Sequence, residues 1–173
     1  MKEICFFTDG SSLNNQKKGQ RRGGVGVFFG DKDPRNISRS LVESKHFKVT
    51  NQVAELLACV NGIERLLSSQ KILGKQIVIY TDSMYIVNMM SDWASTWSRN
   101  EWRKNDGGPI KNLSIVKKLY YYTINIGIIF RHVKSHKNEP AKDDPNYFKW
   151  YGNMQADKLA VQASKKINYS KKK

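Results

Sequence analysis

Four acidic residues, each in a different segment of this 173-residue chain, could act together: Asp9 in FFTDGSS, Glu55 in TNQVAELLA, Asp82 in VIYTDSMY and Asp157 in YGNMQADKLA. Asp9 and Asp82 end apolar, β-branched runs, whereas Glu55 and Asp157 lie in helical patterns, so one fold could gather all four. Each Asp alone is better explained by a turn, a cap or the helix dipole. Glu55 shares an apolar helical face with Cys59, where a carboxylate is costly to bury unless it is paired or binds a metal. Taken together, the four predict a cation site.

The residue types also indicate which cations would bind. Carboxylate oxygens suit Mg²⁺ or Mn²⁺, and two Cys far apart in the sequence with only three His argue against zinc. Two hard divalent cations about 4 Å apart can activate a water and stabilise the leaving oxygen of a phosphodiester. The pattern therefore favours a site for hard divalent cations.

Apolar runs at strand spacing alternate with runs at helical spacing, which predicts the elements that must position the four acids. The expected strands are 3–8, 23–30, 37–47, 75–81 and 125–133, and the expected helices are 51–68 with Asn51 as N-cap, 83–90, 111–122 and 153–166. Short turns favour antiparallel pairing of the first three strands, and the strand, helix, strand order after them favours parallel pairing. We predict an α/β fold with a mixed five-stranded sheet flanked by helices.

The composition indicates a polyanionic partner. The formal net charge is +15, and with four Trp and eight Tyr this points to nucleic acid.

Cys5 and Cys59 are too few for a disulfide framework and are expected to be reduced thiols. No apolar run approaches the roughly 18 residues of a membrane span, and the start shows no signal-peptide core. We expect an intracellular protein, cytoplasmic or nuclear.

The segment 93–112 breaks the helical pattern. Trp93, Trp97 and Trp102 alternate there with basic residues, and the segment closes with a Gly-Gly-Pro turn. We expect a projecting element with one or two of the tryptophans anchoring its base. The chain is therefore divided into a catalytic domain over 1–166, which includes the protrusion 93–112, and a basic tail over 167–173.

These motifs strongly resemble type 1 ribonuclease H of the eukaryotic or viral kind. The resemblance runs from residue 4 to about 163 and rests on TDGS, TNQVAELLA, YTDSMY, the Trp-rich segment, HVKSH and GNMQADKLA. It implies the ribonuclease H-like fold and an endonuclease that cleaves the RNA strand of RNA:DNA hybrids with two Mg²⁺, or Mn²⁺ as a substitute. Related transposases and integrases share that fold but have a different acidic order.

The resemblance also implies a role for each acidic residue. Asp9 would bridge the two metal ions, Asp157 would help hold the ion that activates water, and Glu55 with Asp82 would hold the ion facing the leaving 3′ oxygen. The products would carry 5′-phosphate and 3′-hydroxyl ends. His136 would assist proton transfer or product release. The stretch 137–156 after it is longer than usual for the family.

Substrate contacts are implied on both strands of the hybrid. The RNA strand and the minor groove would be met by Asn15, Asn51, Gln52 and Met84. The DNA strand would be met by a phosphate pocket of Lys48, Thr50 and Asn112, with Trp97 packed on a deoxyribose. Backbone and 2′-hydroxyl recognition distinguishes RNA from DNA without reading bases. The expected partner is an RNA:DNA hybrid bound by a monomer.

Two alternatives remain open at this point. One is a strand-transfer or resolving DNA nuclease of the same superfamily, which cleavage of hybrid against duplex DNA would separate. The other is a noncatalytic hybrid-binding module that keeps the fold. The intact set of four carboxylates argues against the second alternative.

Overall fold

The sheet has the predicted mixed architecture. The computed structural model describes residues 1–13, 21–135 and 138–166. The sheet order is β3-β2-β1-β4-β5, with β1 (Lys2–Ser12), β2 (Arg22–Phe28), β3 (Ile37–Val42), β4 (Lys75–Thr81) and β5 (Ile128–His132). β2 is antiparallel to β1 and β3, whereas β4 is parallel to β1 and β5. The expected antiparallel meander followed by parallel strands is confirmed.

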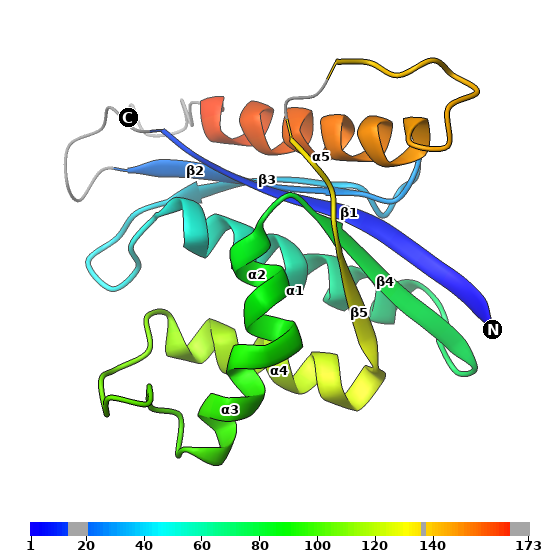
Figure 1. Cartoon of the computed structure of the whole chain (residues 1–173). Helices are drawn as coiled ribbons and strands as arrows, with labels where there is room; N and C mark the ends of the chain where they lie inside the picture. Colours follow the sequence, from blue (N-terminus) through cyan, green and yellow to red (C-terminus); the bar gives the residue numbers. More distant parts are fainter. Residues whose placement is uncertain (14–20, 136–137, 167–173) are drawn as a thin grey trace, which may run out of the picture.

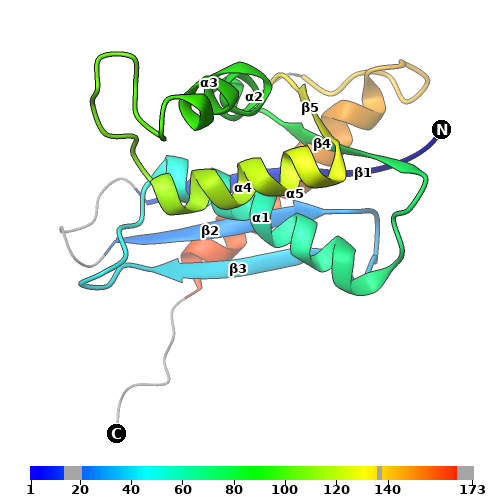
Figure 2. The same ribbon diagram turned by 90° about the horizontal axis from the view of Figure 1, so that it is seen from below.

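Helices cover both faces of the sheet (Figure 1, Figure 2). One face carries α5 (Tyr147–Lys165), and the other carries α1 (Asn51–Ser69) with α4 (Leu113–Ile126) packed beside it. A column leads away from the sheet after β4 and consists of α2 (Met84–Asn88), a π-helical turn (Met89–Trp93) and α3 (Ala94–Arg99). The main core lies between the sheet and α1, and a smaller one lies under α5. Both cores therefore support β1 from opposite sides.

Two glycines allow helices to approach the sheet beside Asp9. A Cβ on Gly10 would lie 2.3 Å from the backbone nitrogen of Glu55, and one on Gly26 would lie 2.1 Å from the carbonyl oxygen of Ala156. Real side chains do not tolerate such distances, so only glycine fits at either position. The first glycine brings α1 against β1, and the second brings α5 against β2.

Two strand boundaries differ from the sequence-based expectation. β1 does not end at residue 8 but continues through Asp9 to Ser12, because β2 offers antiparallel partners as far as the pair Ser12 with Gly23. β3 ends at Val42 instead of residue 47, and an isolated bridge between Ser44 and Phe47 follows it. Asp9 is thus held inside a paired strand.

Two helix boundaries were also predicted wrongly. α4 continues to Ile126, where Gly127 ends it with a left-handed φ of 77°, so β5 is shorter than expected. α5 begins at Tyr147 instead of residue 153, so much of the stretch 137–156 is helical. Asp157 therefore lies deep inside its helix, and a structural role at the helix N-terminus does not explain it.

The Trp-rich segment is anchored more firmly than expected. Its first part is helical, and Trp93, Trp97 and Trp102 all pack, partly buried, against the main core. The rings of Trp93 and Trp97 are 6.2 Å apart, and Trp102 meets Tyr120 of α4 edge to face at 5.4 Å. We expected one or two anchors. The projecting part is thus confined to residues 103–109 of the segment after α3, between the packed Trp102 and the buried Ile110 (Figure 1).

Candidate active site

Three of the four predicted acids meet at one end of the central strands. The parallel pairing of β1 with β4 ends at Thr8 and Thr81, so Asp9 and Asp82 are the next residues on adjacent strands. Glu55 comes from the first turns of α1, which Gly10 admits close to the sheet. One ligand atom from each of the three carboxylates lies within 4.8 Å of the other two. This cluster is the acidic site that the sequence predicted.

Burial disfavours the charged form of two of these acids. Asp9 is 5% exposed and Glu55 is 8% exposed. The pKa of Asp9 is raised well above its ordinary value, first by burial and then by the nearby charges of Glu55 and Asp82. The pKa of Glu55 is raised as well, chiefly by burial, although hydrogen bonds from Asp9 and from the backbone of Gly10 oppose the shift. Without a cation, the cluster therefore tends to bind protons.

The cluster fits a hard divalent cation. The Oε2 atom of Glu55 is buried and has no hydrogen-bond partner. Among the described residues, no Lys or Arg forms an ion pair with Asp9 or Glu55. A buried carboxylate oxygen without a partner is costly, whereas oxygen ligands of this kind are what Mg²⁺ and Mn²⁺ prefer. A cation bound here would satisfy the oxygen and offset the repulsion among the acids.

Asp157 reaches the same site from the opposite face of the sheet. It stands on α5, and its carboxyl group is close enough to that of Asp9 to be among the causes that raise the pKa of Asp9. Asp157 and Asp82 also line a cavity of 260 Å³ beside the cluster. All four predicted acids are thus brought together, with Asp9 in contact with helices from both faces.

The predicted RNA-strand residues lie at the starts of two helices. Asn51 and Gln52 are exposed at the beginning of α1, and Ser12 Oγ donates to Asn51 Oδ1 at 3.4 Å. Met84 begins α2 and is also exposed. Asn15, the fourth residue of that set, lies outside the described residues. The three described residues stand close in sequence to Glu55 or Asp82, at the rim of the site.

The predicted DNA-strand residues are held in different ways. Thr50 is the N-cap of α1, and its Oγ1 accepts a hydrogen bond from the Val53 backbone at 3.1 Å, so the expected N-cap Asn51 was wrong. Lys48 is exposed nearby. Asn112 precedes α4 with a left-handed φ of 57°, and its side chain makes no capping bond. Trp97 is partly buried on α3.

The structure adds residues that the sequence did not reveal. Lys134, Ser135, Trp150 and Asn153 line the cavity of Asp82 and Asp157. Asn153 is 8% exposed, and its Oδ1 has no hydrogen-bond partner. One signal could have found it, because it stands four residues before Asp157 and so on the same helical face. The others required the path of the chain after β5.

The structure describes two of the three histidines of the chain. His132 places Nε2 3.2 Å from the carbonyl oxygen of Asp82. His46 is exposed in the loop after β3. His136 lies outside the described residues, as does the predicted tail 167–173.

Two further features concern the cysteines and the length and polarity of the helices. Cys5 and Cys59 are both free thiols, as predicted. The pKa of Cys59 is raised to about 12 by burial. Within the described part of the chain, no helix combines the length and the apolar character needed to cross a membrane.

Comparisons with known proteins agree with this geometry. The family model of RNase H matches residues 1–165. The ribonuclease H of Schizosaccharomyces pombe is 33% identical over 89% of this chain and 50% of its own length, and that of Rickettsia typhi is 31% identical over 92% and 90%. The chain spans about half the length of several eukaryotic relatives. In structure, it resembles LC9-RNase H1 with a TM-score of 0.68 and 22% identity over 95% of this chain and 72% of the other. The chain therefore belongs to the RNase H family.

Proposed function

We propose that this chain is an endonuclease that hydrolyses the RNA strand of RNA:DNA hybrids. One observation carries the proposal: Asp9, Glu55 and Asp82 converge within 4.8 Å, one buried oxygen of Glu55 has no hydrogen-bond partner, and the carboxyl group of Asp157 is close enough to Asp9 to help raise its pKa. Membership in the RNase H family supplies the substrate class. A binding module that lacked catalysis would have no need to maintain four repelling carboxylates in one place.

The position of each carboxylate suits the role that the resemblance assigned to it. Asp9 lies between the others, since it neighbours Glu55 and Asp82 on one side and Asp157 on the other, which suits a bridging ligand. Asp157, on α5, would hold the water-activating side of the site, and Glu55 with Asp82 the leaving-group side. Mg²⁺ or Mn²⁺ bound there would activate water and stabilise the leaving oxygen, which yields 5′-phosphate and 3′-hydroxyl ends.

Substrate selection would come from the residues at the rim. Asn51, Gln52 and Met84 would contact the RNA strand and its 2′-hydroxyls, together with Asn15. Lys48, Thr50, Asn112 and Trp97 would contact the DNA strand. His136 would assist proton transfer or product release. Since one chain supplies all four carboxylates, the enzyme would act as a monomer, and its two free cysteines suit a reducing intracellular compartment.

The test is a cleavage assay on matched RNA:DNA, RNA:RNA and DNA:DNA duplexes of one sequence, each with Mg²⁺ and with Mn²⁺. We expect cleavage only of the RNA strand in the hybrid. Cleavage of the DNA duplex instead would favour the related strand-transfer nuclease. Equal hydrolysis of all three duplexes would refute hybrid specificity.

A further inference from the structure

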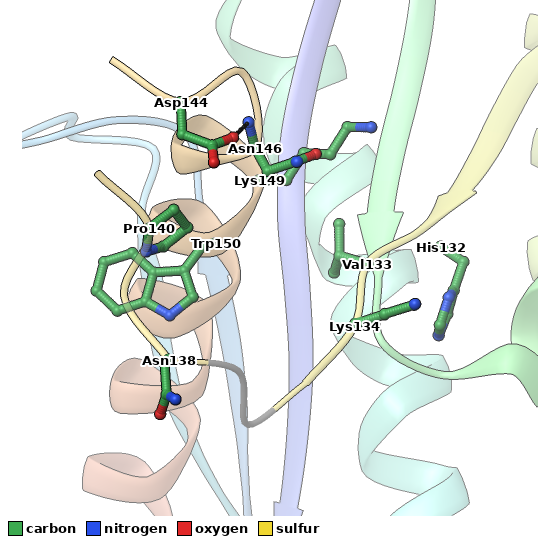
Figure 3. Close-up of a pocket in the computed structure, with 9 residues that line it drawn as sticks. All are labelled: His132, Val133, Lys134, Asn138, Pro140, Asp144, Asn146, Lys149 and Trp150. Atoms are coloured by element: carbon green, nitrogen blue, oxygen red, sulfur yellow. Dashed lines mark hydrogen bonds between the residues drawn. The ribbon is translucent and has the colours of Figure 1, made fainter. Parts of the chain in front are cut away.

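A second cavity adjoins the acidic site on the side of β5. Its volume is 380 Å³, and it lies between the end of β5, the segment 138–146 and the first turn of α5 (Figure 3). Lys134 and Trp150 line both this cavity and the one that contains Asp82 and Asp157. In Figure 3, His132, Val133 and Lys134 come from the β5 side, and Pro140 and Trp150 lie together on the opposite wall. The two cavities therefore adjoin and share part of their walls.

The lining of this second cavity favours an anion. It has two lysines, Lys134 and Lys149, and one acid, Asp144. The Asp144 carboxylate already accepts a hydrogen bond from the backbone nitrogen of Asn146 at 2.7 Å, and its carbonyl oxygen accepts one from Tyr147. Asp144 thus shapes the start of α5. The two ammonium groups, in contrast, form no ion pair among the described residues.

Lys149 also stands where a cation is unfavourable. It is the third residue of α5, a 19-residue helix with no acid in its first turn and no side-chain cap at Asn146. The helix dipole makes this end positive, which disfavours a lysine and favours an anion, and Asp144 is the one acid of the cavity lining that offsets this charge. An anion in the adjoining cavity would interact favourably with both the helix end and the lysine.

We infer that this cavity binds the sugar-phosphate of the RNA strand next to the scissile phosphate, with Lys149 and Lys134 on the phosphate and Trp150 beside the sugar. The inference rests on the proposed function: if the RNA strand is cut at Asp9, the neighbouring nucleotide of that strand would enter the adjoining cavity past Lys134, which lines both cavities.

The test combines a lysine variant with a scan of the phosphates. Lys149→Ala and Lys149→Arg are compared with Lys142→Ala, a matched control, since Lys142 is likewise exposed, on the segment just before α5, but does not line the cavity. Each is assayed on hybrids with one neutral methylphosphonate at successive positions near a single cleavage site. In the wild-type protein, one position in the RNA strand next to that site should lower kcat/KM severalfold.

On the unmodified hybrid, the kcat/KM of Lys149→Ala should be lowered by the same factor. The neutral linkage should not lower the kcat/KM of this variant any further. Its salt dependence of binding should fall by about one phosphate contact. Lys149→Arg should restore most of the effect, and Lys142→Ala should behave as wild type. The melting temperature of Lys149→Ala should stay near that of wild type, because Lys149 is exposed and forms no ion pair among the described residues.

Three results would overturn the inference, and they can be told apart. If Lys149→Ala responds to the scan as wild type does, the cavity does not bind the phosphate, although the proposed function stands. If the sensitive linkage lies in the DNA strand, the wrong strand was assigned. If the wild-type protein cleaves no hybrid at all, the proposed function fails and this inference fails with it.

Discussion

The acidic residues of the site lower the stability of the metal-free protein. Asp9 and Glu55 are buried together, and both pKa values are raised by burial and by neighbouring carboxylates. Such groups must lose protons to bind a metal ion, and in the absence of that ion their charges repel each other. The site is therefore arranged for its ligand at the expense of the free fold, as is common at functional sites.

Stability should consequently fall as the pH rises. A carboxyl group whose pKa is raised by folding stabilises the protein fully below its unfolded pKa, near 4, and this contribution is lost as the pH rises through the folded pKa. We expect the melting temperature of the metal-free protein to decrease from about pH 5 towards pH 8 more steeply for wild type than for Asp9→Asn. Thermal melts across this range check it.

Millimolar Mg²⁺ should reverse most of that decrease in the wild-type protein, since binding to the folded state alone stabilises it. The Asp9→Asn variant should respond less to Mg²⁺. A wild-type melting temperature that rises with pH without metal would contradict the raised pKa values.

At the scale of elements, the sequence allowed the order and type of most strands and helices to be predicted, and three of the four acids selected from it lie in one cluster. These elements could be predicted because β1 and β4 contain continuous apolar runs and α1 has a long apolar face. The boundaries of these elements were harder to predict, because they depend on contacts with distant or irregular segments. β1 extends past Asp9 through its pairing with β2, and α5 begins early because Asp144 shapes its start.

The cavity residues could not be predicted for a similar reason. Lys134 and Trp150 belong to segments that meet only because the chain turns back after β5. Nothing in their local sequence marks them as neighbours of Asp82. Asn153 is the exception, since helical spacing relates it to Asp157.

The contact of α5 with β2 should be sensitive to a single methyl group. Gly26→Ala would place a Cβ 2.1 Å from the carbonyl oxygen of Ala156, so α5 must shift away. We expect a loss of about 1–3 kcal/mol in the free energy of unfolding, together with reduced hybrid cleavage as Asp157 moves relative to Asp9. Denaturant unfolding and a cleavage assay measure both effects.

Gly30→Ala is the matched control for that substitution, because its Cβ would approach nothing closer than 4.0 Å and its backbone is not left-handed. It should leave both the stability and the activity near wild type. Equal behaviour of the two variants would show that the close approach of α5 is not required.

Thr50 and Asn51, two neighbouring residues at the start of α1, should contribute differently to stability. Thr50→Ala removes the hydroxyl that accepts from the Val53 backbone and should cost about 1 kcal/mol of stability, whereas Asn51→Ala, at an exposed position, should cost little. Chemical denaturation measures this difference. Thr50→Ser retains an oxygen at the cap and should recover the stability. The interpretation fails if Asn51→Ala is the more destabilising change.

At the scale of the whole molecule, binding that is driven by charge should be separable from catalysis. The net charge of +15 favours any polyanionic duplex, so duplex DNA should compete with the hybrid for binding without being cleaved. Affinity for both should fall steeply with salt, because each phosphate contact releases counterions. Fluorescence anisotropy between about 50 and 200 mM salt measures the slopes. Salt-independent binding of the hybrid would show that charge contributes little.

The most direct test of the central claim compares wild type with Asp9→Asn in hybrid cleavage with Mg²⁺, alongside the melting temperature of each metal-free protein. Because even the outer partners of metal ligands are worth about 10–100-fold, we expect Asp9→Asn to lose at least about 100-fold in activity. The variant should at the same time melt at least as high as wild type at pH 8. Undiminished cleavage by the folded Asp9→Asn protein would contradict the account.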